Sequence, residues 1–423
     1  MRRVPMAVLA GGGALAVAAA ACLPFGLARA AVTQRQHEPA AASAASPTPS
    51  PPCNQFQSGV AAPQNVSVDN IWPQQALDFQ DVWPLTRGGG VTVAVVDSGI
   101  AQNTPQLRGT VEQTINLAGG SSTDCFGHGT AVAGIIAAAD MQQQGLPFLG
   151  VAPGVKLISI KVQGSEDDGS LATLAEGIED AVELHAQIIN VSIQSCASPV
   201  LQAAVQDALN NNVLIVAAAG NTQEGGNSNS SCANEPQYPA SYSGVLSVAA
   251  ANSDGTPAEF NVTQSRVDVL APGQDIVSTA MDGGYLQGLD GTSFATPYVT
   301  GTAALILSKD PGLSPEQVIQ RIDETAEGNE GAGTGDGMID PYDAVTDNVA
   351  AARAGANSSP SPIKIAGPPP VDHRTRNIGV VVGLGGAGIA LLAGFGGLVV
   401  PIARRRGWQP GRRQPPPSGP PAD

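Results

Sequence analysis

Short runs of Val, Ile and Ala alternate with longer segments of helical spacing along the middle of the chain, and this alternation constrains the fold most. The runs lack a polar residue at every second position, so we expect strands that are buried on both faces. Strands that alternate with helices predict an α/β fold with a mostly parallel central sheet and helices on both faces. The runs lie at 91–96, 157–162, 188–193, 213–218 and 245–250, and the helical segments at 171–186, 200–210, 292–308 and 314–325.

Three polar residues stand at the expected ends of these elements. Asp97 ends the first run, Asn221 follows the fourth, and His128 lies between two glycines at the start of an apolar helix. Asp97 and Asn221 would each also suit an ordinary turn. Because parallel sheets bind their ligands at the carboxyl ends of the strands, the three side chains are candidates for a single site.

The stretch "LDGTSFATPYVTG", residues 289–301, supplies a fourth candidate. Thr292 or Ser293 is predicted to cap a helix, because a hydroxyl oxygen accepts hydrogen bonds from the free N–H groups at a helix start. The other interpretation makes Ser293 a nucleophile at the mouth of that helix. We expect Ser293 to do both.

Together the four residues predict acyl transfer by serine. This chemistry needs a hydroxyl nucleophile, an imidazole base, a carboxylate that orients the base and a donor for the developing oxyanion. Asp97, His128 and Ser293 follow one another in an order known for such triads, and Asn221 falls between the last two.

Several stretches around these residues resemble the subtilisin-like serine proteases, over about residues 65–350. They are "VAVVDSGI", "GHGTAVAG", "VAAAGN" and "DGTSFATPYVTGTAALIL", together with the connecting segments "GVAPGVKLISIKV" and "VDVLAPG". The resemblance implies a subtilisin-like fold in which Asp97 orients His128, the general base and then acid. It also implies that Ser293 forms the acyl-enzyme and that Asn221 donates to the oxyanion, helped by the N–H groups of the helix that Ser293 begins.

The same resemblance implies two walls for the primary specificity pocket. One wall is expected in 190–194 and the other in 217–220, with Ser192, Ile193, Gln194, Ala218 and Gly220 as lining residues. Many relatives have glycine where this chain has Gln194, so the size of the pocket stays open.

An acidic loop is expected beside the edge strand along which a substrate of this family pairs. It contains Glu166, Asp167, Asp168 and Gly169. The loop is either solvated surface charge or a selector of basic residues upstream of the scissile bond. Exposed charge pairs are worth only about 0–1 kcal/mol each, so any such selection would be modest.

The N-terminus and the charge balance indicate an exported protein. Residues 1–30 begin with Met1-Arg2-Arg3 and continue with an apolar stretch and an A-x-A site, which predicts a signal peptide. An uncleaved anchor and lipidation at Cys22 are the alternatives. Residues 60–350 contain 33 acidic residues against 7 Lys and Arg, a formal balance of −26. Nothing basic is contiguous there, so we expect no nucleic-acid partner.

A second apolar run predicts a single transmembrane helix near the C-terminus. Residues 378–402 contain no charged residue, and the length of this run exceeds the roughly 20 residues that a bilayer-spanning helix needs. The arginines that follow the run place the tail, 403–423, in the cytoplasm and the catalytic domain outside the cell membrane. Gly379 and Gly383 form a GxxxG pair, a weak indication of helix dimerisation.

Four cysteines remain after the expected signal peptide. An even number in an exported domain predicts two disulfides, and four cysteines allow three pairings. By the family resemblance we pair Cys53 with Cys125 and Cys196 with Cys232. No C-x-x-C pair occurs, so we expect no zinc site. No cofactor is expected either, and a structural calcium ion stays open.

The order of segments resembles the mycosins, the membrane-anchored subtilases of type VII secretion systems. The segments are a signal peptide (1–30), a flexible N-terminal extension (31–64), a peptidase domain (65–350), a Pro-rich linker (351–377), the membrane helix and the tail. This resemblance implies an extension that wraps the catalytic domain, processing of secreted protein substrates and support of the secretion complex. The alternatives are a scaffold whose protease activity is incidental and a general cell-surface protease.

Overall fold

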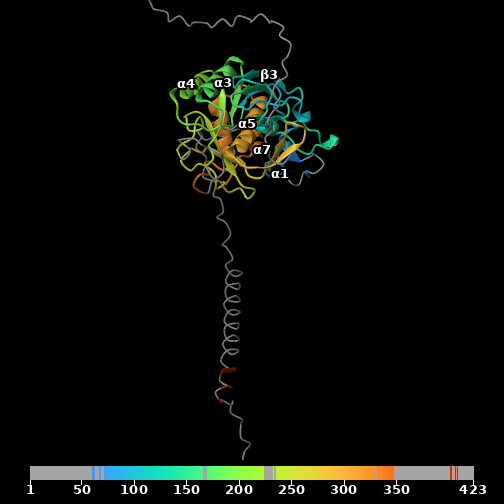
Figure 1. Cartoon of the computed structure of the whole chain (residues 1–423), viewed down its shortest axis with the longest axis vertical. Helices are drawn as coiled ribbons and strands as arrows, with labels where there is room; N and C mark the ends of the chain where they lie inside the picture. Colours follow the sequence, from blue (N-terminus) through green and yellow to red (C-terminus); the bar gives the residue numbers. More distant parts are fainter. Residues whose placement is uncertain are drawn as a thin grey trace, which may run out of the picture. The chain divides into compact units, whose positions relative to one another are not determined.

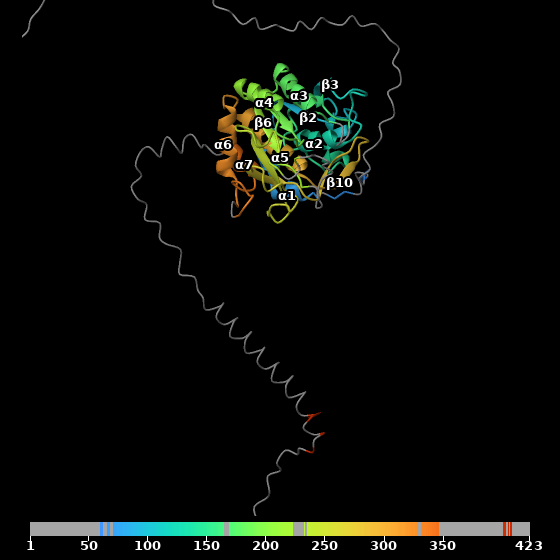
Figure 2. The same ribbon diagram turned by 60° about the vertical axis from the view of Figure 1, so that its left-hand side comes forward.

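A seven-stranded parallel sheet forms the centre of the fold (Figures 1 and 2). The computed structural model describes residues 60–61, 66–67, 71–164, 169–222, 232, 235–328, 331–346, 401–402, 405 and 407. The strand order is β3-β4-β2-β5-β6-β7-β8. The strands are β2 (Thr92–Asp97), β3 (Val111–Asn116), β4 (Lys156–Lys161), β5 (Ile188–Val191), β6 (Leu214–Ala218), β7 (Leu246–Ala251) and β8 (Val269–Pro272).

Helices cover both faces of this sheet. Alternate residues of each strand point to opposite faces, and both faces carry apolar side chains that the helices bury. Val93 and Val95 of β2 belong to the core with α2 (His128–Ala137) and α5 (Thr292–Lys309). Ala94 and Val96 belong to the core with α3 (Leu171–Glu183) and α4 (Pro199–Asn210). Figures 1 and 2 show α3 and α4 side by side, and α5 at the centre. The predicted two-sided α/β architecture is therefore confirmed.

The remaining elements are short or lie outside the sheet. An antiparallel sheet has the order β1-β10-β9, with β1 (Val60–Ala61), β9 (Ile276–Thr279) and β10 (Tyr285–Leu289). The other helices are α1 (Trp72–Ala76), α6 (Pro315–Thr325) and α7 (Pro341–Thr346). Within the described residues, short 3₁₀ helices cover Phe79–Val82, Pro105–Leu107 and Gln142–Gln144.

The segment before β2 is bound to the catalytic domain by several specific contacts. Strand β1 pairs with β10, whose end leads into α5. The indole N–H groups of Trp72 and Trp83 donate to the carbonyl oxygens of Gln274 and Val151, each at 3.0 Å. Of the expected extension, 31–64, the structure describes residues 60–61 alone, so the wrapping that the mycosin resemblance implies stays a prediction.

The chain divides into two units, Met1–Val345 and Thr346–Asp423, and nearly all described residues lie in the first. No helix in the described part of the chain is long and apolar enough to cross a membrane. The signal peptide, the linker and residues 378–400 of the expected membrane helix lie outside the described residues. These segment boundaries therefore stay predictions.

Candidate active site

Asp97 and His128 meet at the carboxyl edge of the sheet. Asp97 ends β2, and His128 is the first residue of α2. Asp97 Oδ1 lies 2.8 Å from His128 Nδ1 and also accepts a 2.7 Å bond from the N–H of Ser98. The Asp97 side chain is fully buried, whereas the His128 side chain is 13% exposed. An acid that is buried and bonded to Nδ1 fixes the imidazole ring, and a partly exposed ring remains accessible to a substrate.

Ser293 lies in the first turn of α5, next to this pair. The ring of Phe294, the following residue, packs on the His128 ring with centroids 5.3 Å apart. Ser293 Oγ donates to the carbonyl oxygen of Ser192 at 2.9 Å, and Ser192 Oγ donates to the carbonyl oxygen of Ser293 at 2.8 Å. Asn190, fully buried on β5, donates to Ser192 Oγ at 2.9 Å. Reciprocal hydrogen bonds therefore fix the serine backbone against the end of β5.

Asn221 approaches the start of α5 from the end of β6. Its Oδ1 accepts bonds from the N–H of Thr292 at 2.9 Å and from Thr292 Oγ1 at 3.0 Å. Gly291 precedes this turn with φ 152°, and a Cβ there would lie 3.2 Å from Asn221 Nδ2. Only glycine readily adopts such a backbone conformation. The residue before the serine turn thus lets the Asn221 amide approach closely.

The expectation that Ser293 or Thr292 caps α5 is wrong. The N-cap position is Gly291, and no side chain there caps the helix. The Thr292 hydroxyl instead accepts from the N–H of Gly220 at 3.2 Å and donates to Asn221. Because the Asn221 oxygen bonds the N–H of Thr292, the cap comes from a residue 71 positions away in the sequence. The Ser293 hydroxyl is free of any capping role.

The expected pocket residues lie beside these groups. Ser192 and Ala218 are buried, and the side chain of Gln194 bonds the backbone of Asn221 at both its N–H and its carbonyl oxygen. Gly169 lies against Gln163, since a Cβ on it would be 3.0 Å from Gln163 Oε1. Asp167 and Asp168 lie outside the described residues, so their expected role stays a prediction.

Sequence reasoning missed Asp124, which organises the turn before His128. Its carboxylate is buried and accepts bonds from Ser98 Oγ, the N–H groups of Phe126 and Gly127, and both the N–H and the hydroxyl of Thr130. Burial raises the pKa of Asp124, and these hydrogen bonds oppose the rise. An acidic residue a few positions before an apolar helix is a capping signal, and it could have identified Asp124.

Lys161 supports the same turn from β4. Lys161 pairs with Asp97 across the parallel β2–β4 ladder, so both side chains lie on one face of the sheet. The buried ammonium donates to the carbonyl oxygens of Ser121 at 3.0 Å and Thr123 at 3.1 Å. The loop that leads to Asp124 is therefore fixed against the end of the sheet.

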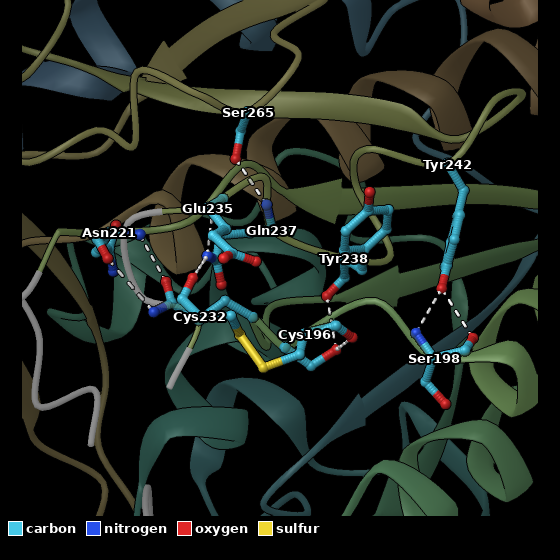
Figure 3. The surroundings of a disulfide bond; sticks show 11 residues. Cys196, Ser198, Asn221, Cys232, Glu235, Gln237, Tyr238, Tyr242 and Ser265 are labelled. Atoms are coloured by element: carbon cyan, nitrogen blue, oxygen red, sulfur yellow. Dashed lines mark hydrogen bonds between the residues drawn. A yellow bond between two sulfur atoms is a disulfide. The ribbon is translucent and has the colours of Figure 1, made fainter. Parts of the chain in front are cut away.

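One of the two expected disulfides is present among the described residues. Cys196 is bonded to Cys232, as Figure 3 shows, so this pairing is confirmed. Cys125 is also disulfide-bonded, but Cys53, its expected partner, lies outside the described residues. The pairing of Cys53 with Cys125 stays a prediction.

Within the described residues, one group of acidic side chains has the geometry to hold a cation. The carboxylate oxygens of Glu327, Asp340 and Asp343 lie within 4.8 Å of one another. Asp340 Oδ1 also accepts a 2.8 Å bond from the N–H of Asp343, as in an ordinary helix start. Glu327 and Asp343 are exposed, so this group is explained as surface charge.

Comparisons with known proteins identify the class. The model of the Subtilase family matches residues 88–356. Mycosin-4 of Mycobacterium tuberculosis is 35% identical over 386 residues, which cover 80% of this chain and 82% of that protein. A thermostable alkaline protease of Halalkalibacterium halodurans is 41% identical over 248 residues, 56% of this chain and 63% of that protease. The chain thus spans less than two thirds of the length of the second relative.

A solved structure agrees with these matches. The crystal structure of MycP1 from the ESX-1 type VII secretion system is similar with a TM-score of 0.59 at 29% identity, over 69% of this chain and 89% of that one. The two-sided parallel sheet and these matches define a serine endopeptidase of the subtilisin type. The chain belongs to the subtilase family, and the expected resemblance to the mycosins is confirmed.

Proposed function

We propose that the protein cleaves peptide bonds through an acyl-enzyme on Ser293. The observation that carries this proposal is the 2.8 Å contact between Asp97 and His128, with the His128 ring against the residue that follows Ser293. A fixed imidazole beside a serine at a helix N-terminus supplies the base and part of the oxyanion site together. Asn221 contributes the remaining donor from its Nδ2.

The reaction proceeds in two steps. Ser293 Oγ turns from the Ser192 carbonyl, gives its proton to His128 Nε2 and attacks the carbonyl carbon of the scissile bond. His128 then returns this proton to the leaving amine as the C–N bond breaks. Water attacks the resulting ester, its proton passes through His128 to Ser293 Oγ, and the acid product leaves. Asp97 remains ionised and stabilises the imidazolium.

A serine-directed fluorophosphonate probe tests this assignment on the intact protein. We expect one labelled site in the wild type, at Ser293, and no labelling of Ser293→Ala. Asp207→Asn, on the outer helix α4, is the matched control and should label as the wild type does. Labelling of Ser293→Ala at an unchanged rate would disprove the assignment.

We propose type VII secretion as the setting. Mycosin-4 aligns over 80% of the chain, and the similar MycP1 protease comes from the ESX-1 type VII secretion system. The protein would process secreted substrates at the outer face of the cell membrane and support the secretion complex. Comparing secretion in a Ser293→Ala strain with a deletion strain separates these roles: normal secretion in the first and loss in the second would make it mainly a scaffold.

The third candidate, a general cell-surface protease, predicts different substrates. Such an enzyme would rapidly cleave unrelated denatured proteins. An enzyme specialised for processing would instead cleave a few sites in secreted proteins and leave denatured casein largely intact. Digestion of both substrate sets by the wild type, with Ser293→Ala as the blank, distinguishes the two.

Membrane anchoring by residues 378–402 completes the proposal. It rests on the uncharged run and on the arginines that follow it. Accessibility labelling of single cysteines should find residues 360–375 outside the membrane and residues 405–423 inside. The opposite pattern would overturn the proposed orientation.

The remaining disulfide would tie the N-terminal extension to the His128 loop. Cys125 directly follows Asp124, so a bond to Cys53 would hold the extension at the turn that Asp124 organises. Non-reducing peptide mapping should recover one peptide pair containing Cys53 and Cys125. Recovery of Cys53 with any other partner would disprove the pairing.

A further inference from the structure

The side chain of Gln194 spans the space between two strand continuations. Strands β5 and β6 pair in parallel up to Val191 and Ala217. Beyond this point they separate, because Ser195 pairs with Tyr238 while Asn221 pairs with Asn261. The Gln194 amide crosses between them: Oε1 accepts from the N–H of Asn221 at 2.6 Å, and Nε2 donates to the Asn221 carbonyl oxygen at 3.3 Å.

Gln237 fills the space behind the same point. Its side chain is fully buried, and a Cβ on Gly220 would lie 2.4 Å from its Cγ and 3.2 Å from Gln194 Oε1. Gly220 has φ 101°, so glycine alone suits this crowded position. The two glutamine side chains therefore converge on Gly220, directly before the oxyanion residue Asn221.

The disulfide holds Gln237 in place. Gln237 Nε2 donates to the carbonyl oxygens of Cys232 and Glu235, each at 2.7 Å, and Cys232 is bonded to Cys196 (Figure 3). The N–H of Gln237 also donates to Ser265 Oγ at 2.9 Å. With these bonds on both its backbone and its amide, Gln237 cannot swing aside to enlarge the space in front of it.

We propose that Gln194 determines specificity by limiting the residue before the scissile bond to Gly, Ala or Ser. This inference rests on the proposed function and on the pocket that the family resemblance implies, in which that residue lies between segments 190–194 and 217–220, next to Ser293 and Asn221. A small side chain fits without moving Gln194. A Leu or Phe side chain requires Gln194 to leave both hydrogen bonds, while Gln237 blocks the space behind.

The amide group suits this position because it donates and accepts at once. A backbone N–H and a carbonyl oxygen of one residue are both satisfied by a single glutamine side chain. Displacing it leaves the Asn221 N–H and carbonyl oxygen without partners beside a desolvated substrate, and unpaired buried groups are costly. Large side chains are therefore disfavoured by lost hydrogen bonds as well as by volume.

Tetrapeptide substrates that differ only in the residue before the scissile bond (Ala, Leu or Phe) test the proposal on the full chain. In the wild type we expect kcat/KM for Ala to exceed that for Phe by at least about tenfold, the scale of discrimination that a small pocket provides. In Gln194→Gly, Leu and Phe should gain at least about tenfold relative to Ala. Gln194→Ala, a milder truncation, should shift the preference in the same direction.

The control is Gln187→Ala, at the opposite end of β5, where the amide oxygen accepts from the N–H of Thr92 at 2.9 Å. It should leave the Ala-to-Phe ratio unchanged. Fluorophosphonate titration gives the fraction of active protein in each preparation, so a misfolded variant is not mistaken for a selective one. Rates are then compared per labelled site.

Three results would overturn the inference. A wild type that cleaves Phe and Ala substrates equally well has no size limit. Equal loss on all three substrates in both Gln194 variants would mean that Gln194 only orients Asn221. If the wild type is labelled at Ser293 and either of these results is found, this inference alone is disproved. If the wild type is not labelled, the proposed function and this inference are disproved together.

Discussion

Helices α2 and α5, which carry the proposed active site, begin differently from α3 and α6 on the outer part of the domain. Helices α3 and α6 begin at Ser170 and Ser314, and each serine forms a reciprocal capping box with the third helical residue. Helices α2 and α5 begin after Gly127 and Gly291, and neither has a side-chain cap at that position. The free N–H groups at the start of α3 and α6 are therefore bonded by the N-cap serine, and those of α2 and α5 are not bonded by the side chain of their N-cap residue.

The active-site helices receive their hydrogen-bond acceptors from other elements. Asp124 accepts from the N–H groups of Gly127 and Thr130 at the start of α2. Asn221, at the end of β6, accepts from the N–H of Thr292 at the start of α5. His128 and Ser293 therefore occupy the first turns without serving as caps themselves. In this protein, caps that come from elsewhere leave first-turn side chains available for chemistry.

The largest effect should follow from replacing the first-turn residues themselves. Ser293→Ala and His128→Ala should each lower kcat by on the order of 10⁶-fold. Because Ser293 does not cap its helix, the melting temperature of Ser293→Ala should stay close to that of the wild type, whereas His128→Ala removes the partner of buried Asp97 and should melt lower. Turnover of a fluorogenic peptide and thermal denaturation check the two parts. A clearly lowered melting temperature in Ser293→Ala would restore the rejected capping role.

Asn221 separates capping from chemistry. Asn221→Ala should lose about 10²–10³ in kcat and also about 1 kcal/mol of stability, because it removes the amide donor and the cap together. Asn221→Asp keeps an oxygen for the N–H of Thr292 and lacks the donor, so it should lose activity while melting near the wild-type temperature. Equal destabilisation of both variants would show that Oδ1 does not cap α5.

Asp323 on helix α6 should make the stability of the domain depend on pH. Burial, with the nearby carboxylates of Asp268, Asp336 and Glu324, raises the pKa of Asp323 to about 7, and Arg266 acts in the opposite direction. Asp323 Oδ1 also has no hydrogen-bond partner. Between about pH 4 and 7 the folded chain keeps a proton that the unfolded chain has released, so this group's contribution to stability falls as pH rises.

Asp323→Asn tests that sign. The variant should melt higher than the wild type at pH 7.5 by on the order of a few degrees, and at the same temperature as the wild type near pH 4. Asp323 is partly exposed, so water screens part of the repulsion and limits the gain. The matched control is Asp207→Asn, an exposed aspartate on α4 that is not among the groups acting on Asp323. A higher melting temperature of Asp323→Asn at both pH values would contradict the prediction.

The caps of the outer helices should matter for stability alone. Ser314→Ala removes the hydroxyl that accepts from the N–H of Gln317, at a cost of about 1 kcal/mol, which lowers the melting temperature of a domain of this size by about 2–4 °C. Its kcat should equal that of the wild type. A kcat loss as large as that of Asn221→Ala would abolish the contrast between the two kinds of helix start.

The sequence predicted five of the seven strands of the central sheet and helices α3 to α6, because both leave local patterns. The buried edge strand β8 was missed. The runs 91–96 and 245–250 each lie within one residue of β2 and β7. Strand β3 was not predicted, since its sequence "VEQTIN" is polar and half-exposed at the edge of the sheet. Strands β9 and β10 were also missed, because short antiparallel strands leave little periodic signal.

The site was predictable where the motifs are local and not where the contacts are long-range. The pairing of Asp97 with His128 and the Cys196–Cys232 disulfide agree with what the family resemblance implied. The cap of α5 was misassigned, because nothing near Ser293 reveals that an amide 71 residues away bonds the N–H of Thr292. The two hydrogen bonds between the Gln194 side chain and the Asn221 backbone could not be predicted either, since they join two loops that only the folded sheet brings together.

The smallest effect concerns the loop before α3, where a locally capped helix follows the expected substrate strand. If Asp167 and Asp168 select basic residues upstream of the scissile bond, the double variant Asp167→Asn/Asp168→Asn should cleave basic and neutral substrates in a lower ratio than the wild type does. Exposed charge pairs contribute about 0–1 kcal/mol each, so the loss of two should lower the ratio by at most about thirtyfold at low salt. At about 0.5 M salt, where screening is strong, the ratio should change little. Glu183→Gln, at the exposed far end of α3, is the matched control. An unchanged ratio at low salt would mean that the acidic loop is surface charge, and that α3, like α6, begins at a structural cap with no part in recognition.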